Sequence, residues 1–562
     1  MRPYMNPQAF PSDPGLPQLR IAGDPGLMPE VFQRHLQPLA GKAYHIQDCI
    51  LSRIRYRRAA RWILRYTLHL VELDTGRDPG RAGQRRSGGE DLVRERHVEH
   101  DSKALTPPSP QKGGHIGQGK RQGVRMIVFA MLLAISLVLQ GRASAAQPAT
   151  EAVTPPAFDP GAPPETRTVV APFLTFGGRL ELEYQLEKNF DLDNSDDDEL
   201  STVEPKLSLA FSFDPSRHVQ VYLNVGLLRE IALTEGRDRS ERERRVRLEL
   251  KHAFVLFKDL FDGRFSLQVG RQRFRDDREW LYDDELDAVR AFYRVAKLSL
   301  ELSVSRKNLV DRDLLHGEDK ERINNYFLYG RYALTEKVAI AAYTFFRDDH
   351  SSERERPIFF GLQSKGEIVD DLEYWLELAH ARGKDGSKRI RGWGLDLGAT
   401  YEFDQPLRPS MTVGYAFGTG DGDPNDRVDR SFRQTGLQGN EDKFNGVTRF
   451  KYYGELFDPE LSNLSIFTGG FGIRPTRRSS IDLVYHYYLQ HKASDTIREA
   501  EIDEDPTGRS RRLGSEIDLI VGYREIRNVD IKLLLGYFIP GKAFPSGADN
   551  AFFANLEIRY HF

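Results

Sequence analysis

The chain of 562 residues carries 80 basic and 83 acidic side chains, which gives a formal net charge of −3. This balance does not indicate a nucleic-acid partner, because such proteins usually carry a clear basic excess. The single cysteine, Cys49, excludes a disulfide framework and a cysteine-based metal site. The length allows either several domains or one large barrel.

The first 172 residues differ in composition from the rest of the chain. Residues 1–125 are rich in Pro, Gly and Arg and show no sustained alternation, so we expect a non-native or disordered N-terminal extension. Residues 126–145 predict a signal peptide, with basic residues before them, the apolar run MIVFAMLLAISLVL and a small-residue A-S-A cleavage site. We therefore expect translation to begin at Met126. A single transmembrane anchor is the alternative, although the run is shorter than the roughly 20 residues that span a bilayer. Residues 146–172 predict a proline-rich linker.

Residues 173–562 contain about 18 or 19 segments in which apolar and polar residues alternate, each near the roughly 10 residues of a membrane-crossing strand. One candidate, residues 447–456, is less regular than the others. Short and long connections alternate between the segments, as they do in outer-membrane barrels. The last segment has one apolar face and ends on the aromatic Phe562, which is typical of a strand that closes such a barrel. We predict an all-β fold, a transmembrane antiparallel β-barrel of about 18 strands.

In such a barrel the apolar face of each strand meets lipid and the polar face lines the lumen. This rule places seven arginines in the lumen: Arg245, Arg247, Arg290, Arg294, Arg331, Arg524 and Arg559. Three others occupy the alternate strand positions that belong to the apolar face: Arg271, Arg273 and Arg275. Gly270 is a candidate bulge site that would turn these three inward, and otherwise they lie at the rim. Rings of basic side chains select anions. The alternative is that the charges pair with each other in the wall of a nonselective pore.

Two segments carry a resemblance to a known family. Residues 269–293, VGRQRFRDDREWLYDDELDAVRAFY, and residues 432–464, FRQTGLQGNEDKFNGVTRFKYYGELFDPELSNL, resemble hallmark segments of the alginate export outer-membrane family. The resemblance implies a monomeric 18-stranded barrel in the outer membrane of a Gram-negative bacterium, with a narrow electropositive pore that passes a polyuronate. It also implies that the second segment lies on a long loop that returns to a strand and gates the lumen. The candidate pore-constriction residues that it carries over are Arg271, Arg273, Arg275, Asp276, Asp277 and Arg278.

The predicted function is export of an anionic exopolysaccharide such as alginate, and a general anion- or solute-selective porin is the alternative. An enzyme is not expected, since G-x-S-x-G and H-E-x-x-H patterns are absent, and we assign no catalytic residue, metal ligand or cofactor. The expected partners are the anionic polysaccharide, outer-membrane lipid and lipopolysaccharide, and periplasmic export-complex proteins. Residues 191–199 and 421–429 are rich in the oxygen ligands that Ca²⁺ prefers but lack EF-hand spacing, so specific calcium binding stays open.

Overall fold

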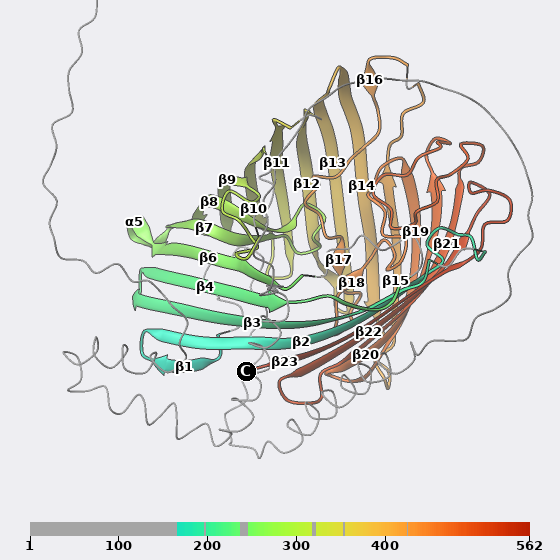
Figure 1. Ribbon diagram of the computed structural model, residues 1–562. Coiled ribbons are helices and arrows are strands. Elements are labelled where there is room, and N and C mark those ends of the chain that lie inside the picture. Colours follow the sequence, from blue (N-terminus) through green and yellow to red (C-terminus); the bar gives the residue numbers. More distant parts are fainter. Residues whose placement is uncertain (1–165, 196–197, 236–244, 317–321, 352–353, 424) are drawn as a thin grey trace, which may run out of the picture. The chain divides into compact units, whose positions relative to one another are not determined.

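A computed structural model describes residues 166–195, 198–235, 245–316, 322–351, 354–423 and 425–562. Within these ranges, eighteen antiparallel strands form a closed wall (Figure 1). The wall closes where the first of these strands pairs with the last, from Arg179↔His561 to Lys188↔Phe552. The first nine are β2 (Leu174–Lys188), β3 (Leu200–Ser216), β4 (Val219–Leu228), β6 (Arg247–Asp259), β7 (Phe265–Arg275), β8 (Asp283–Val295), β9 (Leu298–Arg306), β10 (Ile323–Ala333) and β11 (Val338–Asp349). The other nine are β12 (Glu355–Val369), β13 (Leu372–Asp385), β14 (Lys388–Glu402), β15 (Ser410–Gly418), β19 (Leu464–Thr476), β20 (Ser479–Gln490), β21 (Arg512–Tyr523), β22 (Val529–Pro540) and β23 (Ala551–His561).

The two ends of the barrel differ in their connections. At one end, the short-turn end, brief turns join the strands, including one helical turn, α5 (Leu260–Gly263). At the other, the long-loop end, residues 419–463 join β15 to β19 and residues 491–511 join β20 to β21. This asymmetry matches the sequence prediction. The candidate strand at residues 447–456 is wrong as a wall strand, because these residues belong to the first of the long connections. Within the described ranges, no helix has the length and apolar character needed to cross a membrane.

Alternation along each strand separates an apolar outer face from an inner face. On β10, Tyr326 and Leu328 are exposed on the outside, whereas Phe327 and Tyr329 point inward and are buried. Because successive strand residues point to opposite faces, the outward set forms the apolar surface that a bilayer requires. The inward residues are buried because other parts of the chain fill the lumen.

Five short strands supplement the wall. β1 (Thr168–Ala171) pairs with β2 and lies at the end of the segment expected to be a linker. β5 (Ile231–Glu235) pairs with β3, β16 (Val428–Asp429) runs parallel to β14, and β17 (Glu441–Asp442) pairs with β18 (Phe450–Lys451). The β17–β18 pair lies inside the ring of wall strands (Figure 1). It is part of residues 432–462, which we call the plug.

The plug packs against the inner wall through aromatic side chains. Phe444 stacks on Trp375 of β13 with ring centroids 5.6 Å apart, and Phe457 stacks on Phe538 of β22 at 5.1 Å. Phe432, Phe457 and Leu461 are completely buried. The hydrophobic core of this protein therefore lies within the barrel, where the plug packs against inward-facing residues of the wall strands.

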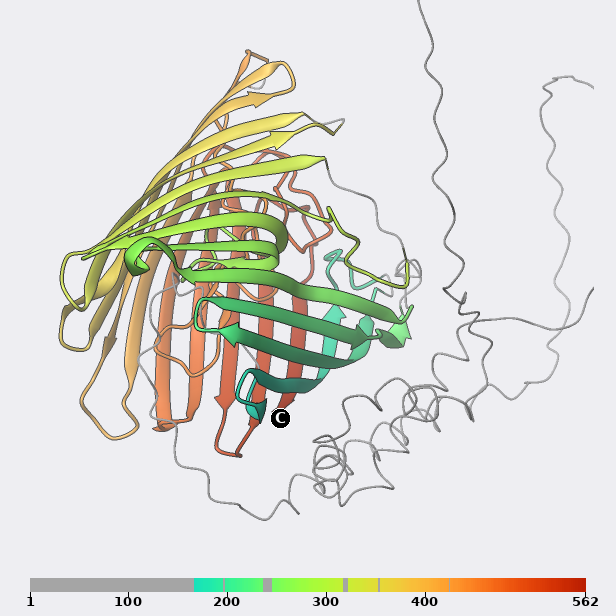
Figure 2. The same ribbon diagram turned by 90° about the vertical axis from the view of Figure 1, so that its left-hand side faces the viewer.

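A second element enters the lumen from the wall itself. β7 pairs with β6 only as far as Ala253↔Arg271, and β8 pairs with β9 only as far as Asp287↔Arg306, within the described residues. Beyond these points the two strands continue in register with each other to Arg275↔Asp283. Residues 272–286 thus form a two-stranded ribbon that leaves the wall. The strong curvature of these green strands is visible in Figure 2.

Two local features allow the ribbon to leave the wall. Gly270 has φ of +123°, and a Cβ there would meet the carbonyl oxygen of Ala253 at 2.2 Å, so only glycine fits. Residues 312–314 then occupy the vacated edge of β6. The amide of Leu250 donates to the Arg312 carbonyl at 2.9 Å, and the amide of Leu314 donates to the Leu248 carbonyl at 2.8 Å.

Candidate functional site in the barrel lumen

The tip of the ribbon, residues 276–282, is joined to the plug. The Trp280 ring stacks on Phe432 with centroids 5.8 Å apart, and its Nε1 donates to the Tyr453 hydroxyl at 3.0 Å. The side-chain Nε2 of Gln434 donates to the backbone carbonyl of Trp280 at 3.1 Å. The two hallmark segments, distant in sequence, therefore form one structure inside the lumen.

The backbone of the tip is held by two acidic residues. The carboxylate of Asp276 accepts the amides of Trp280, Leu281 and Tyr282 at 3.3, 3.0 and 3.0 Å, which shapes a tight loop. Burial raises the pKa of Asp276 to about 6. The carbonyl of Glu279 accepts the amides of two plug residues, Gly439 at 2.9 Å and Asn440 at 3.0 Å. Asp276 thus holds the loop in shape, and it also lines a small cavity beside the ribbon.

Arg278 also has a structural role. It is 3% exposed and forms ion pairs with Asp396 of β14 at 3.0 Å and Asp442 of the plug at 3.3 Å. Its guanidinium lies over the rings of Trp375 and Tyr452, 4.4 and 4.1 Å from their centroids. A guanidinium with two carboxylates and two rings around it has no face left for a ligand. Arg278 clamps the ribbon and plug to the wall.

Five cations from the ribbon, the plug and the turn after β21 neighbour one another in a row. Arg273 and Arg275 lie on the ribbon face that is turned away from the buried Phe274, and their side chains are 43% and 35% exposed. Arg275 interacts electrostatically with Arg273 and with Arg449 of the plug. Lys443 of the plug interacts in turn with Arg449 and with Arg524, which follows β21 at the short-turn end. We call these five residues the cation track.

The arginines of the track form ion pairs with acidic residues, whereas Lys443 forms none with the described residues. Arg273 pairs with Asp283 at 2.6 Å, and both Arg275 and Arg449 pair with Glu279, Arg449 at 3.1 Å. No hydrogen-bonding or ion-pair partner of the Lys443 ammonium is found among the described residues. Burial lowers the pKa of Lys443, and three nearby cations, Arg524, Arg449 and Lys365, add to this effect against the single nearby acid Asp442. Positive charge at this point of the lumen is therefore undercompensated, which favours an anion there.

Other predicted residues lie in different places. Arg271 is buried where the ribbon leaves the wall, pairs with Asp287 at 2.8 Å and donates to the Leu250 carbonyl at 3.2 Å. Gly270 does not shift the β7–β8 register. Instead the whole ribbon bends, and this brings Arg273 and Arg275 into the lumen on their original face.

Arg290 is buried in the wall and forms a bidentate pair with Glu301 at 2.7 and 3.0 Å. Arg247 contacts Glu249 at 3.3 Å near the start of β6, and Arg245 precedes that strand. Arg294 lies at the exposed short-turn end of β8. The guanidinium of Arg290 also donates to the carbonyl of Arg273 on the ribbon at 3.2 Å.

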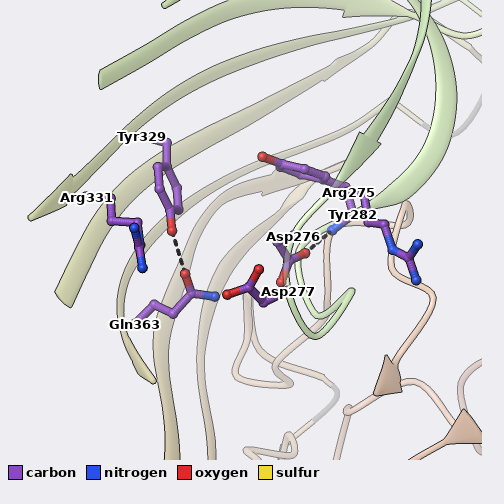
Figure 3. Close-up of a pocket in the computed structure, with 7 residues that line it drawn as sticks. All are labelled: Arg275, Asp276, Asp277, Tyr282, Tyr329, Arg331 and Gln363. Carbon is purple, nitrogen blue, oxygen red and sulfur yellow. Dashed lines mark hydrogen bonds between the residues drawn. The ribbon is translucent and has the colours of Figure 1, made fainter. Parts of the chain in front are cut away.

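Asp277 and Arg331 line a small cavity together with Arg275, Tyr329 and Gln363. The close-up shows Asp277 next to Gln363, whose amide oxygen accepts the Tyr329 hydroxyl at 2.7 Å, and Arg275 pointing away from Arg331 (Figure 3). The carbonyl of Asp277 also accepts the Arg449 guanidinium at 3.2 Å. Arg275 therefore belongs both to the lining of this cavity and to the cation track.

Strand alternation in the sequence does not select Arg449 or Lys443. Both belong to the second hallmark segment, but they are on a connection, where the inward and outward alternation of strands does not apply. Arg524 is placed in the lumen by this alternation, and it lies one residue after the end of β21. Only the packing of the plug reveals that these cations continue the row begun on the ribbon.

The closed wall, its apolar outer face and the filled lumen define an outer-membrane β-barrel. The chain belongs to the alginate export family, whose model matches residues 173–552. It is 25% identical over 343 residues to the alginate production protein AlgE of Pseudomonas aeruginosa, covering 50% of this chain and 68% of that protein. The alginate production protein AlgE of Pseudomonas syringae pv. tomato is 22% identical over 362 residues, covering 50% and 69%.

Solved structures of similar fold include two from Pseudomonas aeruginosa. OccK11 (OpdR) is 14% identical with a TM-score of 0.45, covering 69% of this chain and 95% of that one. OpdQ is 12% identical with a TM-score of 0.46, covering 69% and 98%.

Proposed function

We propose that this barrel exports an anionic exopolysaccharide, alginate or a related polyuronate, from the periplasm to the cell exterior. The single observation that carries the proposal is the cation track, which runs from the ribbon through the plug to the short-turn end of the barrel. Guanidinium groups stay charged at any physiological pH and pair well with carboxylates. A polymer with one carboxylate per sugar matches a row of separated cations.

The acidic partners of the track make its contacts weak enough to release the polymer. Arg273, Arg275 and Arg449 each already contact a carboxylate, so a passing uronate shares these cations rather than binding to bare charge. Conduction requires that binding be strong enough to enter and weak enough to leave. Lys443, for which the described residues supply no such partner, is the strongest point of attraction. A polymer entering at the short-turn end would meet Arg524 first and Lys443 next.

The plug implies a closed resting state. It fills the lumen and is held by polar contacts as well as by aromatic stacking, so a polymer passes only after the plug shifts. Arg278 and Arg433 are the buried clamps of this state. Arg433, which is 1% exposed, pairs with Asp385 at 3.0 Å and contacts Glu355 and Asp429. The protein acts as a monomer, with lipopolysaccharide around it and export-complex proteins at the periplasmic end.

The test is the ion selectivity of the pore when the track is neutralised. The triple variant R273Q/R275Q/K443Q should lose most of the anion selectivity measured by reversal potential in a planar bilayer. The matched control is K337Q, because Lys337 pairs with Glu367 and Asp370 at the surface of the short-turn end, outside the lumen. Unchanged selectivity in the triple variant would contradict the proposal and favour a general solute porin.

A further inference from the structure

Glu279 occupies a special position beneath the cation track. Its side chain is completely buried, yet its carboxylate contacts the guanidinium groups of both Arg275 and Arg449, with 3.1 Å to Arg449. No other acidic residue among those described has ion pairs with two cations of the track. The residue therefore touches the track at its centre, where the ribbon meets the plug.

The position of this carboxylate is fixed by the backbone. Glu279 has φ of +54°, an uncommon conformation for a residue with a side chain, and its carbonyl accepts two plug amides. A Cβ on Gly439 would lie 2.6 Å from Glu279 Oε2, so the glycine leaves room for the carboxylate. The chain is built so that an acid lies between two arginines that face the lumen.

We propose that Glu279 is a specificity-determining residue, whose buried carboxyl group sets how much positive charge Arg275 and Arg449 present to a passing anion. This inference rests on the proposed function. When the carboxyl group is ionised, it offsets one of the two guanidinium charges. When it is protonated, both charges act on the lumen and the track binds anions more strongly.

The surroundings allow the carboxyl group to change its charge near neutral pH. Two cations, Arg275 on the ribbon and Arg449 on the plug, favour the ionised form. Burial and two acids, Asp283 on the ribbon and Glu441 on the plug, oppose it. Neither oxygen of Glu279 accepts a hydrogen bond of good geometry from the described residues. Burial is the largest of these effects and raises the pKa of Glu279 to about 7.

The sign of the effect follows directly. Below about pH 7 the carboxyl group is neutral and anion selectivity is high, and above it the group is ionised and anion selectivity falls. One unit charge at about 8 Å in water changes the local concentration of a monovalent ion by about two- to threefold, in opposite directions for anions and cations. The anion-to-cation permeability ratio should therefore fall by about four- to sixfold between pH 6 and pH 8.

The experiment measures this ratio in planar bilayers at pH 6 and pH 8 for the full protein and two variants. E279Q, which keeps the shape, should hold the high value at both pH values. E441Q, which removes a repelling charge, should retain the change but move its midpoint to lower pH, a shift that a merely structural role would not produce. Heat-modifiable migration on gels confirms that each variant is folded.

The outcomes separate this inference from the proposed function. An anion-selective channel whose ratio changes equally with pH in the wild type and in E279Q overturns the role of Glu279 and leaves the export proposal standing. An anion-selective wild type whose permeability ratio is equal at the two pH values also overturns the role of Glu279 and leaves the export proposal standing. A channel without anion selectivity at either pH overturns both.

Discussion

The indole Nε1 of Trp280 donates a hydrogen bond to the hydroxyl oxygen of Tyr453 at 3.0 Å, across 173 residues of sequence. The same hydroxyl donates to Asp396 of β14 at 3.1 Å. This short chain of hydrogen bonds ties the ribbon, the plug and the wall together at one point. All three residues are buried, so each group relies on the others rather than on water.

Replacing Tyr453 by Phe should loosen the plug without unfolding the barrel. The change leaves the buried Trp280 N–H without its acceptor and Asp396 without one donor, at a cost of about 1–3 kcal/mol. We expect more frequent opening in single-channel recordings, while gel migration stays that of the folded wild type. The Y485F variant is a suitable control, because Tyr485 lies on the outer face of β20. Equal opening in Y453F and wild type would contradict a role of this contact in closure.

Replacing Arg278 by Met should have a larger effect of the same kind. It leaves Asp396 and Asp442 as buried carboxylates that have lost a shared cation, and breaking such a buried pair costs about 3–5 kcal/mol. We expect higher conductance with anion selectivity retained, since Arg278 does not face the lumen. A loss of anion selectivity at unchanged conductance would instead support the sequence prediction that Arg278 lines the constriction.

Replacing Gly270 by Ala should impair assembly. The positive φ and the contact with the Ala253 carbonyl leave no room for a methyl group, so the ribbon cannot leave the wall as it does here. The expected result is a reduced yield of folded, heat-modifiable protein in the outer membrane. Gly469 of β19 is the matched control, because a Cβ there has no atom within 4 Å. Equal yields of G270A and G469A would argue against the hinge.

Docking of the plug should depend on pH through Glu455. Burial raises the pKa of this plug carboxyl group from its usual 4.5 to about 7. Protonation of Glu455 therefore stabilises the docked plug relative to the released plug. This stabilisation is fully present below about pH 4.5 and is lost as the pH rises to about 7. The change amounts to about 3 kcal/mol.

We expect the open fraction of the channel to rise between pH 5 and pH 7.5 and to stay level above that. E455Q should make the open fraction depend less steeply on pH. Part of the dependence should remain, because burial also raises the pKa of Glu460 to about 7. E336Q, in the exposed turn after β10, should behave like the wild type. An open fraction that falls with rising pH would contradict this sign.

The wall was predictable from sequence because strand alternation reports directly on which face meets lipid. Eighteen of the candidate segments are wall strands, and the residues 447–456 fail because an irregular plug is buried on all sides and has no period-two pattern. The site was predictable only in part. Arg273 and Arg275 keep the strand face that alternation assigns to them, but this face turns into the lumen, and no local signal in the sequence shows that a strand pair leaves its sheet.

The buried roles of Arg271 and Arg278 also follow from tertiary contacts. Each pairs with carboxylates that are adjacent only in the folded barrel, Asp287 across the ribbon base for Arg271 and Asp396 for Arg278. An arginine that faces a lumen and one that clamps a loop have the same sequence appearance. The resemblance of these two segments to the family selects both kinds of arginine, because both are needed for the structure that fills the pore.

The most direct measurement of the central claim is the reversal potential of the purified protein in a planar bilayer, followed by addition of polyuronate or neutral dextran. Export of a polyanion along the cation track predicts anion selectivity, together with block of the current by micromolar polyuronate and none by dextran. Weak selectivity, with no difference between the two polymers, would contradict the account and leave a general porin.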